Sequence, residues 1–173
     1  YRTVNETINS AIGGINVSAD NPGVRKLQVS LISTNSKTTG GTLSLGTTKG
    51  LNFTRGDGEE DRQMTFQATL ADINRALDSL VYNANRPGSD SISITVDDRD
   101  SDSPGSAQTG TETINIFVND LPRVVKNNEL VVANQTLTQP IDTTSLRTTD
   151  SDNGDDTFTY TVTSSPEEGR LLV

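Results

Sequence analysis

The stretch Ser91-Ile92-Ser93-Ile94-Thr95-Val96 decides the fold class, because every second residue in it is apolar and the residues between carry hydroxyl groups. A period of two puts the apolar side chains on one face of a β-strand and the polar side chains on the other. Residues 27–31 and 114–118 follow the same period. The sequence therefore predicts strands with one face buried and one face in water.

Further short strands are predicted at regular spacing, separated by clusters of Gly, Asn, Asp, Ser and Pro. The predicted strands are Ile15–Val17, Leu27–Ser33, Gly41–Leu45, Leu51–Phe53, Met64–Gln67, Leu80–Asn83, Ser91–Val96 and Glu112–Val118. This spacing favours an all-β sandwich of two antiparallel sheets. Hydrophobic residues make up only 31% of the chain and aromatic residues 4%, which fits a thin core between two sheets.

One segment, residues 69–80, has helical spacing instead. Its apolar residues Leu70, Ile73, Leu77 and Leu80 are three or four positions apart. Thr69 can cap the first turn, and an acidic residue follows three positions later. We expect one short helix across an end of the sandwich, with a structural role.

The composition excludes several classes of function. The chain has no cysteine and no histidine, so disulfides, the usual transition-metal sites and histidine acid–base catalysis are absent. A net charge of −9 disfavours nucleic-acid binding. No apolar run is long enough for membrane insertion, and no catalytic motif is present. We therefore expect a protein that is not an enzyme.

The C-terminal third repeats the order of features found at the N-terminus. An acidic turn, a predicted strand at Phe158–Val162 and Gly169-Arg170-Leu171 follow one another there, as similar features do before Gly41. Pro122 cannot continue a central strand, so the linker is predicted near residues 119–124. We expect a complete module at residues 1–120, and a linker plus the N-terminal part of a second, related module at residues 121–173.

Residues 4–120 resemble the cadherin-like, immunoglobulin-like tandem repeats of large bacterial surface adhesins. The resemblance rests on residues 40–45, 51–58, 64–82, 88–98 and 114–120. Residues 128–173 resemble the start of a repeat named for chondroitin sulphate proteoglycans. That second resemblance rests on Leu146, Thr149–Asp152, Phe158–Ser164, Pro166 and Gly169–Leu171.

These resemblances imply an extracellular or cell-surface protein built from rigid spacer and adhesive modules, commonly stiffened by calcium. Its partners would be the neighbouring repeats of the same chain, with a cell-surface protein or carbohydrate as a further candidate. The alternative is a carbohydrate- or protein-binding accessory module of a large secreted enzyme. The scarcity of aromatic residues argues against a carbohydrate site.

Calcium is the one cofactor that the residues favour, since Ca²⁺ binds six to eight oxygen ligands. Two acidic clusters are dense enough to supply them, Asp97, Asp98, Asp100 and Asp102, and Asp150, Asp152, Asp155 and Asp156. Neither has the spacing of an EF-hand loop. The alternative is that these aspartates serve only turn geometry and solubility.

The resemblance to cadherin-like linkers adds a second possible calcium site. It implies shared ions held by Glu6, Asn119, Asp120, Asp150 and Asp152. Phe117 and Val118 stand where that linker has a further aspartate, so the full set of ligands is not present. The tripeptide Arg55-Gly56-Asp57 matches an integrin-binding motif, but Gly56-Asp57-Gly58 is also what a tight turn requires.

Overall fold

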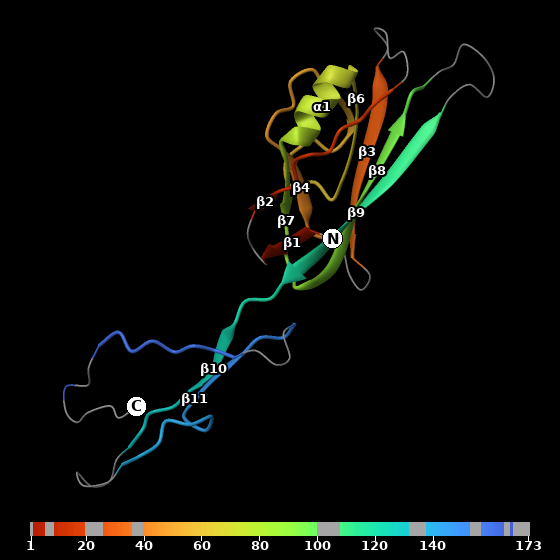
Figure 1. Cartoon of the computed structure of the whole chain (residues 1–173). Helices are drawn as coiled ribbons and strands as arrows, with labels where there is room; N and C mark the ends of the chain where they lie inside the picture. Colours follow the sequence, from red (N-terminus) through yellow and green to blue (C-terminus); the bar gives the residue numbers. More distant parts are fainter. Residues whose placement is uncertain are drawn as a thin grey trace. The chain divides into compact units, whose positions relative to one another are not determined.

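The computed structural model describes residues 2–5, 9–19, 26–35, 40–99, 108–131, 138–152, 157–164 and 167. The chain divides into two compact units, residues 1–120 and 121–173. The division falls between Asp120 and Leu121, where the sequence places the end of the first module. Figure 1 shows the elements of each unit.

Unit 1 contains two sheets of unequal size, of six and three strands. The larger sheet has the order β1 (Arg2–Asn5), β9 (Thr109–Asn119), β8 (Gly88–Asp97), β3 (Leu27–Asn35), β6 (Gln63–Ala68) and β5 (Asn52–Arg55). The smaller sheet has the order β2 (Asn9–Ala11), β7 (Leu80–Asn83) and β4 (Thr42–Leu45). All neighbouring strands are antiparallel except β1 and β9, which are parallel.

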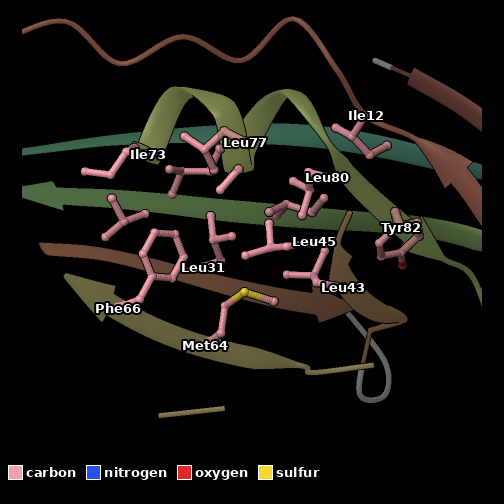
Figure 2. Packing of buried hydrophobic residues seen from close by; sticks show 14 of the residues in the cluster. Ile12, Leu31, Leu43, Leu45, Met64, Phe66, Ile73, Leu77, Leu80 and Tyr82 are labelled. Carbon is pink, nitrogen blue, oxygen red and sulfur yellow. The ribbon is translucent and has the colours of Figure 1, made fainter. Parts of the chain in front are cut away.

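The core lies between the two sheets and follows the alternation in the sequence. In β3 the buried residues Leu27, Val29 and Leu31 alternate with half-buried polar or apolar residues. Met64 and Phe66, both in β6, are fully buried beneath the helix and the smaller sheet, as Figure 2 shows. The predicted immunoglobulin- and cadherin-like β-sandwich with one short helix is confirmed.

The helix α1 (Leu70–Asp78) completes the cover of the larger sheet. Thr69 is its N-cap, and its side chain accepts a hydrogen bond from the backbone N–H of Asp72. The buried residues Ile73 and Leu77 point toward the sheet in Figure 2. The predicted helix is therefore confirmed, although it ends at Asp78 and Leu80 already belongs to β7.

The predicted strand Ile15–Val17 is wrong, because the described residues 12–19 form no strand. The side-chain amide of Asn74 on α1 takes the place of a strand partner. The backbone N–H of Val17 donates to Asn74 Oδ1 at 2.8 Å, and Asn74 Nδ2 donates to the carbonyl oxygen of Val17 at 3.0 Å. The sheet strand of this region lies earlier, at β2.

Unit 2 contains a single two-stranded ribbon among its described residues, formed by β10 (Arg123–Asn127) and β11 (Leu146–Thr149). The predicted strand Phe158–Val162 is wrong for this chain, because residues 157–163 pair with no described strand. All the exposed large hydrophobic side chains of the described residues lie in this unit: Leu121, Val124, Val125, Leu130, Val131, Ile141, Tyr160 and Val162.

A buried polar cluster joins the two sheets of unit 1. The hydroxyl of Tyr82 in β7 donates a hydrogen bond to Asp90 Oδ2 in β8, and both residues are buried. Asn35 Nδ2 donates to Asp90 Oδ1, and the N–H of Gly41 donates to the Tyr82 hydroxyl at 3.0 Å. A Cβ atom at position 41 would lie only 2.2 Å from the carbonyl oxygen of Asn83, so this approach requires glycine.

Burial, together with the hydrogen bond to Asp90, raises the pKa of Tyr82 well above its ordinary value. The phenol therefore stays protonated in the folded state, whereas an unfolded tyrosine loses its proton near pH 10. The folded state then binds more protons than the unfolded state above about pH 10, and stability falls as pH rises from there. Below about pH 10 the contribution of Tyr82 is fully present.

We predict that Tyr82→Phe lowers the free energy of unfolding at neutral pH by about 1–3 kcal/mol, because Asp90 loses a buried partner. Urea unfolding from about pH 7 to pH 11 measures this loss. The difference between wild type and Tyr82→Phe should shrink above about pH 10, by at most about 1.4 kcal/mol per pH unit. Tyr160→Phe is the control, because Tyr160 lies in unit 2, where its hydroxyl accepts a hydrogen bond from the Thr148 N–H, so the unfolding of unit 1 and its pH dependence should not change. A difference that stays constant with pH would contradict the role assigned to the phenol proton.

Candidate functional site

The first group of predicted calcium ligands lies at the end of β8. Asp97 Oδ1 accepts a hydrogen bond from the backbone N–H of Arg99 at 2.7 Å. Asp98 Oδ1 accepts one from the backbone N–H of Gln108 at 2.9 Å, and Asp98 N–H donates to the Gln108 carbonyl oxygen at 3.1 Å. Asp98 thus joins the two ends of the β8–β9 connection, whereas Asp97 closes a turn at its start. Asp100 and Asp102 lie outside the described residues.

The second group lies at the end of β9. Asn119 is the Cα partner of Asn5 in β1, and its side-chain amide donates to the carbonyl oxygen of Asp120. Asp120 is buried, with 6% of its surface exposed. The predicted partner Glu6 lies outside the described residues. Asp97 pairs with Thr109 at the other end of β9, so the first two groups are separated by the length of that strand.

The third group lies in unit 2, directly after β11. The backbone N–H of Asp152 donates to Asp150 Oδ1 at 3.4 Å, which closes a short turn. Asp142, before β11, was not among the predicted ligands but has the same kind of local role. Its carboxylate accepts hydrogen bonds from the hydroxyl and the N–H of Thr144, which lower the pKa of Asp142.

The Arg55-Gly56-Asp57 tripeptide belongs to a turn built around another carboxylate. Asp61 Oδ2 accepts hydrogen bonds from the N–H groups of Asp57 at 2.9 Å and Gly58 at 2.8 Å. Asp57 Oδ1 in turn accepts from the N–H of Glu59 at 3.0 Å. Both glycines of the turn have positive φ, 72° at Gly56 and 92° at Gly58. The turn alone explains why these residue types stand here.

Carboxylate oxygens are suitable ligands for calcium, but the described residues gather them only in pairs. Among the residues that the structure describes, no three acidic or histidine side chains lie close enough together to hold a metal ion. A Ca²⁺ ion needs six to eight oxygen ligands, so no described pair would hold one by itself. The carboxylates of Asp97, Asp98 and Asp150 accept hydrogen bonds from nearby backbone N–H groups.

The cluster around Tyr82 and Asp90 was not predicted from the sequence. A signal was present, because Asp90 stands two residues before Ile92 and therefore on the buried face of β8. A buried acidic residue needs hydrogen-bond donors. Tyr82 can supply one, because it stands two residues after buried Leu80 and therefore lies on the buried face of β7. The alternation therefore contains a signal for the burial of both residues, while their contact depends on how the sheets pack.

None of the helices in the described part of the chain has the length and apolar character needed to cross a membrane. No curated protein and no solved structure matches the chain. A family model described as cadherin-like matches residues 122–173, which begin two residues after the last residue of unit 1. The C-terminal part of the chain is therefore similar to a cadherin-like adhesion-type repeat.

Proposed function

We propose that the chain is part of an extracellular adhesion protein, in which unit 1 is a complete cadherin-like spacer and unit 2 begins a second repeat. The cadherin-like match that starts at residue 122 carries this proposal. Cadherin-like domains are typically extracellular and typically non-enzymatic. The sandwich of unit 1 and its end at Asp120, next to the matched region, support a series of modules along one chain.

The strand pairing of unit 1 suits a spacer that carries tension. β1 and β9 are the first and last strands of the unit, and they are parallel, with Arg2 opposite Ile116 and Asn5 opposite Asn119. A force that pulls the two ends of the unit apart slides these strands along each other. Their hydrogen bonds then resist together, whereas strands that are peeled apart lose their bonds one after another.

We predict that unit 1 unfolds at a higher force when pulled through positions 1 and 121 than when pulled through cysteines placed at Asn52 and Gln67. Those two residues are Cα partners in β5 and β6, so pulling on them peels β5 away. Single-molecule force spectroscopy measures both geometries, and the absence of native cysteine makes the attachment points unique. An equal or lower force in the first geometry would overturn the tension-bearing role.

We also propose that calcium stiffens the protein, with Asp97 and Asp98 as ligands together with Asp100 and Asp102 of the same connection. The sequence density of carboxylates supports this, and Asp97 and Asp98 lie next to each other at the end of β8. The candidates for a linker site are Glu6, Asn119, Asp120, Asp150 and Asp152.

We predict that millimolar Ca²⁺ raises the melting temperature relative to chelator, because a ligand that binds only the folded state stabilises it. A concentration one hundred times the Kd adds about 2.7 kcal/mol. The double variant Asp97→Asn with Asp98→Asn should abolish the shift if the ions bind at the β8–β9 connection, and Asp120→Asn if they bind at the linker. Glu59→Gln, at an exposed turn, is the control. A melting temperature that does not respond to Ca²⁺ would remove calcium and leave the spacer proposal standing.

A further inference from the structure

The N-terminal half of β9 is an open sheet edge. β8 pairs with residues 109–118 of β9 on one side, but β1 covers only Ile116–Asn119 on the other. Residues 109–113 are exposed on both faces of the strand, and no described strand lies beside them on the side away from β8 (Figure 1). An edge of this kind presents unpaired N–H and C=O groups and can accept another strand.

The alternation of the ladder shows which groups face outward. Asp98 N–H donates to the Gln108 carbonyl oxygen, so Gln108 points its backbone groups toward β8. In an antiparallel pair the direction alternates from residue to residue. Thr109, Thr111 and Thr113 therefore point their N–H and C=O groups toward the open edge.

The other edge strands of unit 1 have features that hinder pairing with a further strand. β5 carries an irregularity between Phe53 and Arg55, which bends the edge. The edge of β4 is already bonded, since Leu43 N–H donates to the Asp61 carbonyl oxygen at 2.7 Å and Asp61 N–H donates back at 2.9 Å. β2 and β1 have only three and four residues. The half of β9 at residues 109–113 has none of these devices among its described surroundings.

Gly110 gives an independent indication that another backbone approaches this edge. A Cβ atom at position 110 would meet nothing within 4 Å, and Gly110 is not among the glycines with positive φ. Neither space nor conformation in unit 1 therefore requires glycine, although glycine weakens a strand. Glycine inside a strand often marks a place where another backbone comes close.

We propose that residues 109–113 pair antiparallel with the same residues of a second copy of this chain, about a two-fold axis at Thr111. This register sets Thr111 opposite Thr111 and Thr109 opposite Thr113, with the outward-pointing backbone groups facing each other. It also sets Glu112, the one charged residue of the segment, opposite Gly110 of the second copy. A register with its two-fold axis at Glu112 would set Glu112 against Glu112, and like charges directly opposite each other destabilise a sheet.

The contact is small and joins two copies with a net charge of −9 each. A strand pair of this length buries less surface than a permanent dimer needs, so the contact is a weak one. Repulsion between the copies is screened by salt, and added NaCl should therefore strengthen the dimer. A contact driven by attraction between opposite charges would respond in the opposite direction.

Cross-linking of Thr111→Cys in the full chain tests the register. The chain has no cysteine of its own, and Cα atoms of a hydrogen-bonded antiparallel pair lie about 5.5 Å apart, a distance that a disulfide spans. We expect disulfide-linked dimers to form faster with Thr111→Cys than with Asn52→Cys, an exposed residue on the β5 edge. Equal rates for the two variants would overturn the proposal.

A charge exchange at Gly110 provides a second test. Gly110→Glu places a glutamate opposite Glu112 of the second copy, twice in each dimer, whereas Gly110→Lys places a lysine there. The dimerisation constant should therefore be about tenfold higher for Gly110→Lys than for Gly110→Glu. Residue 110 is exposed, and a Cβ atom there would meet nothing within 4 Å. Asn52→Glu and Asn52→Lys repeat the change in net charge at the other edge. Sedimentation velocity measures all four, and a difference at position 110 no larger than that at position 52 would overturn the pairing.

Discussion

The hydrogen bond between Tyr82 and Asp90 joins the smaller sheet to the larger one within a mostly apolar core. A chain with few aromatic residues has little apolar surface to bury, so the two sheets need more than packing to fix their alignment. A buried carboxylate is stable only with its donors in place, and here they come from β3 and β7. In the observed placement of the sheets the Gly41 N–H also lies 3.4 Å from Asp90 Oδ2, and the close approach of Gly41 to the Asn83 carbonyl oxygen belongs to the same arrangement.

The alternation of apolar residues predicted the strands whose one face is buried by the opposite sheet. β7 has the predicted bounds, and β3 and β8 contain the predicted stretches. β1 was missed because its partner β9 is more than a hundred residues away, and a four-residue stretch carries no period of its own. Ile15–Val17 was predicted as a strand but is not one. Its alternation reflects partial burial, while the backbone hydrogen bonds of Val17 go to the side chain of Asn74 on α1.

The predicted calcium ligands show what residue type and spacing leave open. Asp97 and Asp98 have the density expected of a cation site, yet their Oδ1 atoms accept hydrogen bonds from backbone N–H groups of their own connection. Asp142 and Asp61 do the same in other turns. A carboxylate that holds a turn and one that binds calcium have the same spacing along a strand end. Only the position of further oxygen atoms from other segments distinguishes them, and a linear pattern does not contain it.

The two halves of β9 differ in composition because they have different neighbours. The half that pairs with β1 contains Ile116 and Val118, both buried, and the sequence predicted it from these residues. The other half, Thr-Gly-Thr-Glu-Thr, has no apolar residue and lies beyond the core, so the predicted strand began only at Glu112. Its ladder with β8 nevertheless continues to Thr109. Hydrophobic patterning detects the part of a strand that covers a core, whereas backbone pairing extends it into a segment that is open to another chain.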